Sequence, residues 1–76
     1  MGNERVKRFW TLGRADDPKS SMACDLINSG RGLEVRCHAG ETVVHRQDVA
    51  SLADALNLCE AWKALYCGRG WVERFE

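Results

Sequence analysis

The sequence predicts an α+β domain in which an antiparallel meander of three or four strands is covered on one face by a single C-terminal helix. Up to about residue 49, short alternating or apolar runs are separated by turn residues, as in a strand meander. From residue 51 the apolar residues recur every three or four positions, as in an amphipathic helix. The 76 residues are expected to form one domain, near the lower size limit for a core without disulfides or metal.

Four strands are expected before the helix, over residues 5–14, 22–28, 33–38 and 42–49. The segment ADDPKSS, which contains Asp17 followed by Pro18, predicts a turn between the first two. The loop NSGRG separates the second strand from the third, and a turn around Gly40 separates the third from the fourth. The chain shows no internal repeat or linker.

The central hairpin carries enough signal to predict its register. A four-residue loop over residues 29–32 places Asn28 opposite Leu33, Leu26 opposite Val35 and Cys24 opposite Cys37. The register of the fourth strand stays open. A two-residue turn puts Thr42 and Val44 on the inner face, whereas a three-residue turn puts Val43 and His45 there.

The helix is predicted over residues 51–67. Ser51 with Asp54 three residues later has the form of a capping box, and Gly68 and Gly70 follow where a left-handed cap is expected. Its apolar stripe comprises Leu52, Ala55, Leu56, Cys59, Trp62 and Tyr66. The predicted core joins most of this stripe to strand residues: Trp10, Leu12, Cys24, Leu26, Leu33, Val35, Cys37, Leu52, Leu56, Cys59, Trp62 and Tyr66. Because Leu56 is placed in this core, Leu56→Asp is expected to cost several kcal/mol.

Composition narrows the classes of function. The 11 basic and 11 acidic residues cancel, whereas proteins that grip a phosphate backbone usually carry a positive excess. No apolar run approaches the length of a membrane span, the N-terminus lacks the apolar region of a secretory signal, and Val6 stands where a myristoylation motif requires Ser or Thr. The cytoplasm is therefore the expected compartment, with no membrane contact.

Chemical motifs are not expected to add an enzymatic activity. Cys37 and His38 point to opposite faces of a strand, and Cys59 lies about 12 Å by helical rise from Cys67, so no zinc knuckle forms. Directly opposed Cys24 and Cys37 could reach bonding distance, but a cytoplasmic protein keeps its thiols reduced. No catalytic residue, cofactor or metal ligand is predicted.

Two surfaces are candidates for binding. Leu58 and Leu65 lie beside the main helical stripe, where they either rim the core with Trp71 and Phe75 or form a surface for a protein partner or a second copy. The open face of the sheet is the other candidate. It is expected to carry Arg8, Arg36, His38 and Arg46, a set that could contact nucleic acid, although Asp25 and Glu34 share that face.

The segments GLEVRC (32–37) and EAWKA (60–64), with a strand ending in Arg46-Gln47 between them and G-x-G-W after them, resemble a group of small hypothetical bacterial proteins. This resemblance implies the meander-plus-helix plan and a bacterial origin, and it carries no functional residues over. Three strands followed by a helix are also similar to integrase arm-binding and AP2-like DNA-binding domains, but those read DNA with a basic sheet.

The function expected from the sequence is a small non-enzymatic protein-interaction module of bacterial or mobile-element origin, with self-association into a dimer as one form. A nucleic-acid-binding domain that uses the open sheet face is the first alternative. A small inhibitor of a larger complex is the second.

Overall fold

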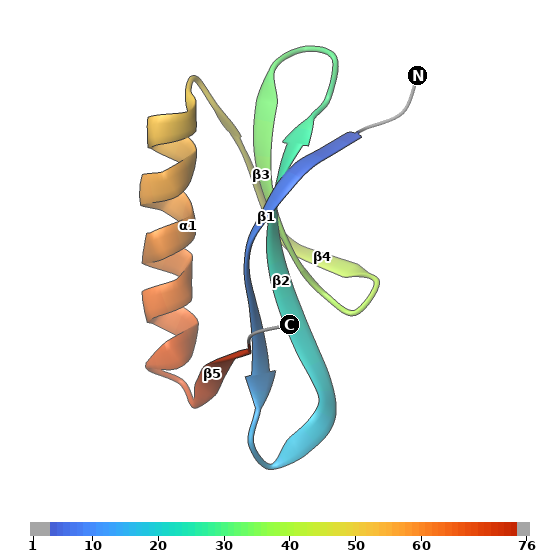
Figure 1. Ribbon diagram of the computed structural model, residues 1–76, viewed down its shortest axis with the longest axis vertical. Helices are drawn as coiled ribbons and strands as arrows, with labels where there is room; N and C mark the ends of the chain where they lie inside the picture. The colour runs from blue at the N-terminus through green and yellow to red at the C-terminus, as the bar shows by residue number, and fades with distance from the viewer. Residues whose placement is uncertain (1–3, 75–76) are drawn as a thin grey trace.

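The computed structural model describes residues 4–74 as one five-stranded antiparallel sheet in the order β4-β3-β2-β1-β5, with a single helix lying along one face (Figure 1). The elements are β1 (Glu4–Arg14), β2 (Asp17–Asn28), β3 (Leu33–Ala39), β4 (Thr42–Val49), α1 (Leu52–Cys67) and β5 (Trp71–Arg74). The α+β class and the meander are confirmed. The expectation of three or four strands is wrong, because the tail after the helix returns and pairs with β1.

Local sequence signals explain how the helix begins and ends. The Ser51 hydroxyl accepts a hydrogen bond from the Asp54 amide at 3.2 Å, as the capping motif predicts. At the other end the Gly68 amide donates to the carbonyl of Ala64, but Gly68 has a right-handed φ of -68°, so the left-handed cap expected at this residue is wrong. Gly70 then adopts a φ of 99°, a left-handed conformation that glycine tolerates, and the chain enters β5.

The β1–β2 hairpin is longer than the turn residues suggested. Arg14 already pairs with Asp17, so β2 begins five residues before the expected strand. The Asp17 carboxylate accepts hydrogen bonds from the Lys19 amide and the Ser20 hydroxyl, which is how a turn-like sequence is held at the start of a strand. This hairpin runs along the length of the molecule (Figure 1).

The predicted register of the central hairpin is confirmed, including the directly opposed Cys24 and Cys37. The fourth strand follows neither alternative completely. Its turn has two residues, since Ala39 pairs with Thr42, but a bulge then shifts the register so that Cys37 pairs with His45. Val44 is the extra residue of that bulge.

The core lies between the sheet and α1. Its buried members are Trp10, Leu12, Met22, Cys24, Leu26, Val35, Cys37, Ala55 and Cys59. The placement of Leu52 and Leu56 in the core is wrong, because their side chains are 49% and 43% exposed. The several kcal/mol expected for Leu56→Asp assumed a buried leucine, so that expectation no longer holds.

The helix turns its small residues toward the sheet. Ala55 and Cys59 are buried, and the Trp10 indole donates a hydrogen bond to the Cys59 carbonyl at 2.8 Å. A large side chain at either position would displace the indole from the helix backbone. Leu58, Trp62 and Tyr66 pack at the margins of this contact.

Within residues 4–74 no helix combines the length and the apolar character needed to cross a membrane.

Candidate functional site

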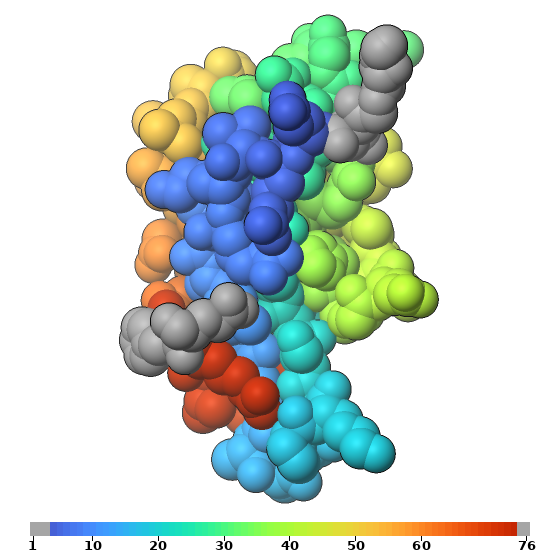
Figure 2. Space-filling model, turned by 45° about the vertical axis from the view of Figure 1, so that its right-hand side comes forward, coloured from blue at the N-terminus to red at the C-terminus, as the bar shows by residue number. Residues whose placement is uncertain are grey.

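The strand β4 forms one edge of the sheet. Among the described strands it has a neighbour on one side only, β3, and in the space-filling view it lies along the right-hand margin (Figure 2). From His45 to Val49 the pairing with β3 is regular, and the bulge at Val44 ends that regular stretch. The outer side of an edge strand presents backbone donors and acceptors that another strand can bind.

A shallow, open groove of about 410 Å³ borders this edge on the helix side. Leu58 and Ala61 supply apolar surface from the helix, and Val49 supplies it from the strand. The complete lining is Gln47, Asp48, Val49, Ala50, Asp54, Asn57, Leu58 and Ala61. The end of β4 and the first half of α1 thus form the two walls.

A second hollow of about 380 Å³ borders the same edge on the open face. Its lining is polar and comprises Ser29, Arg31, Gly32, Leu33, Glu34, Arg36, Arg46, Asp48 and Val49. Glu34 is 3% exposed, and its two carboxylate oxygens lie 3.0 Å from Arg36 Nη2 and from Arg46 Nε. The contact with Arg36 is a hydrogen bond, whereas the contact with Arg46 is an ion pair without hydrogen-bond geometry.

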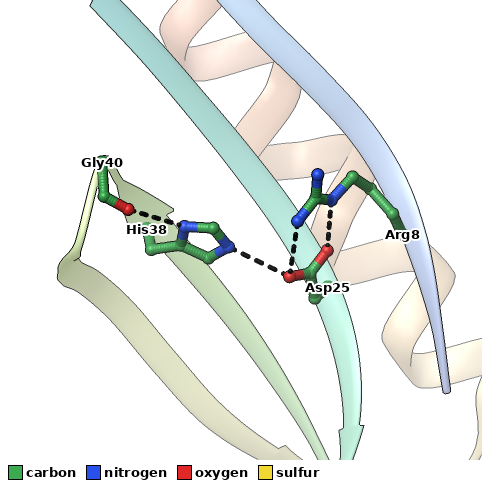
Figure 3. Close-up of polar contacts among 4 residues, drawn as sticks. All are labelled: Arg8, Asp25, His38 and Gly40. Carbon is green, nitrogen blue, oxygen red and sulfur yellow. Dashed lines mark hydrogen bonds and ion pairs between the residues drawn. The ribbon is translucent and has the colours of Figure 1, made fainter. Parts of the chain in front are cut away.

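A neighbouring ion-pair cluster on the open face is centred on Asp25, which is 5% exposed (Figure 3). Arg8 donates from Nε at 2.8 Å and from Nη2 at 3.4 Å, and His38 Nε2 lies 3.0 Å from the same carboxylate. Burial alone would raise the pKa of Asp25, but the hydrogen bonds from Arg8 and His38 outweigh it and hold that pKa below its usual value.

The ring of His38 lies between two acceptors. Nδ1 is 3.2 Å from the Gly40 carbonyl, and Nε2 faces the Asp25 carboxylate (Figure 3). Because a carbonyl and a carboxylate oxygen only accept, both contacts are hydrogen bonds in the imidazolium form alone. In that form Asp25 lies between two cations.

The two ion-pair clusters contain all four basic residues of the predicted nucleic-acid face. The structure brings Arg8, Arg36, His38 and Arg46 to the open face, as expected, and places each of them against Asp25 or Glu34. Phosphate contacts require cationic side chains that can turn to the phosphates and neutralise them. Four basic groups around two buried carboxylates suit a structural role, and nucleic-acid binding stays a prediction.

The structure places the residues of the predicted protein interface at separate locations and not on one surface. Leu58 lines the groove beside β4, whereas Leu65 is 43% exposed and is not part of that groove. Trp71 is half-buried and lies edge-on to Tyr66, with Arg14 over its ring. Phe75 lies outside the described residues.

Of the β4 edge, sequence reasoning singled out Arg46 as a candidate binding residue and missed Gln47, Asp48 and Val49, which line the two hollows with it. It also missed a contact between β4 and the helix, where His45 stacks on Trp62 and hydrogen-bonds to the Tyr66 hydroxyl. Burial raises the pKa of Tyr66, so its hydroxyl is kept neutral. A signal was present, because the last strand of a predicted meander lies at an edge and because β4 carries the charged residues Arg46 and Asp48, as edge strands often do.

The cysteines differ sharply in accessibility. Burial raises the pKa of Cys24, with Cys37 as a further cause, raises that of Cys37 to about 11, and also raises that of Cys59. Cys67 is exposed. No group of three metal-ligating side chains occurs within residues 4–74.

We therefore expect one fast-reacting thiol in the native protein and four after unfolding, because the thiolate is the reactive form and burial disfavours it. Maleimide labelling followed by mass spectrometry, with and without guanidinium, measures this. The control Cys67→Ser should remove the fast reaction. Rapid labelling of Cys24 or Cys37 in native buffer would contradict the packing.

Comparison with family models, with curated proteins and with solved structures finds no match for this chain. The resemblance to small bacterial proteins and the expected bacterial, cytoplasmic setting therefore stay predictions.

Proposed function

We propose that this protein is a non-enzymatic interaction module that binds an extended protein segment as an added strand at the β4 edge. The observation that carries the proposal is the position of β4 between two hollows, one on each face of the sheet. Strand addition is a common mode of peptide recognition, in which backbone hydrogen bonds supply affinity and pockets for alternate side chains supply specificity.

The two hollows match the geometry of an added strand. Successive side chains of a strand point to opposite faces of its sheet. A segment paired with His45–Val49 would direct one set of side chains toward the groove at Leu58 and Ala61. The other set would point toward the polar hollow that contains Arg46. A segment that alternates apolar and polar side chains fits this site.

The other open strand edge is less suitable. In the described residues β5 covers only Thr11–Arg14 of β1, which leaves the first part of β1 without an outer neighbour. The register of that part shifts after Arg5 and again after Arg8. Each shift interrupts the ladder that an added strand needs, so β4 offers the longer regular template.

Selection from a library of displayed linear peptides tests the proposal. We expect enriched peptides to shift the amide NMR signals of β4 and of the groove residues Leu58 and Ala61. Ala61→Glu places a carboxylate in the groove beside Asp54 and should weaken binding at least ten-fold. Leu65→Lys, on the same helix but outside the groove, should leave binding unchanged. Failure of a monomeric protein to enrich any peptide, or shifts confined to other surfaces, would overturn the proposal.

A further inference from the structure

The partner of the β4 edge can be identified by symmetry and charge. We infer that the added strand is β4 of a second copy of this chain, paired antiparallel about a two-fold axis at Gln47. This inference rests on the proposed function and names its partner. The result is a dimer with one continuous sheet across both copies.

Symmetry restricts the registers that two such strands can adopt. A two-fold axis that pairs edge strands antiparallel is perpendicular to the sheet, so it keeps each face on its own side. The axis then passes through one residue and its equivalent in the second copy. The regular stretch of β4 runs from His45 to Val49, and Gln47 is its midpoint. An axis at Gln47 therefore uses all of the regular stretch, and the bulge at Val44 lies just beyond it.

Charge selects the same register. Arg46 and Asp48 both lie on the open face, since they pair with Arg36 and Glu34 of β3. An axis at Arg46 or at Asp48 places that residue against its own equivalent, and like charges directly opposite are destabilising. An axis at His45 puts Arg46 opposite Val44. An axis at Gln47 puts Arg46 opposite Asp48 of the second copy, and symmetry forms this ion pair twice.

The charges that would form these pairs are available. Asp48 lies across the ladder from buried Glu34, a second acid, and makes no ion pair within residues 4–74. The Arg46 side chain is 70% exposed and faces Glu34 through Nε. Because a guanidinium has five donors, its two Nη groups can bind Asp48 of the second copy while Nε stays at Glu34.

The remaining features of the edge agree with self-pairing. The Gln47 side chains would meet on the helix side at the axis, and each amide supplies both a donor and an acceptor for the other. Charged residues on an edge strand oppose unspecific pairing. Here they would reject the neighbouring like-charge registers and accept one, which gives the interface its specificity.

Solution mass by light scattering across a concentration series tests the inference. We expect the wild-type protein to dimerise. Asp48→Arg places an arginine opposite Arg46 of the second copy at both symmetry-related positions, and it should raise the dissociation constant of the dimer at least ten-fold. The double variant R46D/D48R exchanges the charges, restores both ion pairs and gives Glu34 an arginine directly opposite, so it should dimerise again. Glu60→Arg, an equal change of charge on the exposed side of the helix, should remain dimeric. Thermal melts check that each variant is folded.

Three results would overturn the inference. A wild-type monomer at millimolar concentration excludes self-pairing; if selected peptides still bind at β4, the proposed strand-addition function survives. A dimer that Asp48→Arg does not split, or that the charge exchange does not restore, uses another surface or register. A monomer for which no peptide is enriched removes both the inference and the proposed function.

Discussion

Trp10→Ala is expected to lower the free energy of unfolding by about 3–5 kcal/mol, which is most of the stability that a domain of this size carries. The Trp10 side chain is 4% exposed and lies where β1 faces the middle of α1. Its indole nitrogen donates to the Cys59 carbonyl, so the substitution removes both the filled volume and the hydrogen bond that joins sheet to helix. Urea denaturation followed by circular dichroism measures the loss.

Two companion variants separate these contributions. Trp10→Phe keeps most of the volume and removes the donor, so we expect a smaller loss, on the order of 1–2 kcal/mol. Leu56→Ala removes a leucine of the same helix whose side chain is 43% exposed, and it should change stability by no more than about 0.5 kcal/mol. A large effect at Leu56 together with a small one at Trp10 would show that the helix presents its other face to the sheet.

The contrast between Trp10 and Leu56 also shows what the sequence could determine. Two signals that act within a few residues predict the structure correctly: the Ser51 cap and the loop that sets Cys24 opposite Cys37. The turn signal of residues 15–21 does not, because β2 already begins at Asp17. The rotation of the helix depends instead on which side chains fit against the Trp10 indole. Hydrophobicity favours leucine at such a contact, whereas the residues that are buried where the indole meets the Cys59 carbonyl are the small Ala55 and Cys59.

For the candidate site, the sequence predicts which residues share the open face but not how deeply they are buried or which partners they have. The alternation of the strands placed Asp25 and Arg36 on one face correctly. It could not show that Asp25 and Glu34 are buried, because that depends on Arg8 and Arg46 reaching them from neighbouring strands. The predicted meander already implied that its last strand lies at an edge, but the hollows beside β4 depend on how the helix and the neighbouring loops pack against it, which the sequence does not show.

The Asp25 carboxylate provides the second prediction. Asp25→Ala leaves Arg8 and His38 without their shared acceptor, and we expect a loss of about 1–3 kcal/mol of unfolding free energy near neutral pH. This loss of unfolding free energy is smaller than for a fully buried ion pair, because the Arg8 side chain is 34% exposed and water screens its charge. Chemical denaturation at pH 7 measures it, with the exposed Asp16→Ala as control, for which little change is expected.

The pH dependence of stability tests whether the charge of Asp25 causes this stabilisation. The folded pKa of Asp25 lies below its ordinary value of 3.8, so the ionised carboxylate stabilises the fold fully above that value. This stabilisation is lost as the pH falls through about 4 and then through the lower folded pKa. The difference in stability between the wild type and Asp25→Asn should therefore shrink as the pH falls from about 5 to about 2. Asp17, whose pKa is also lowered, is present in both proteins and cancels from this difference. A difference that does not change with pH would mean that Asp25 acts through packing, and the ion-pair cluster would then have no electrostatic role in stability.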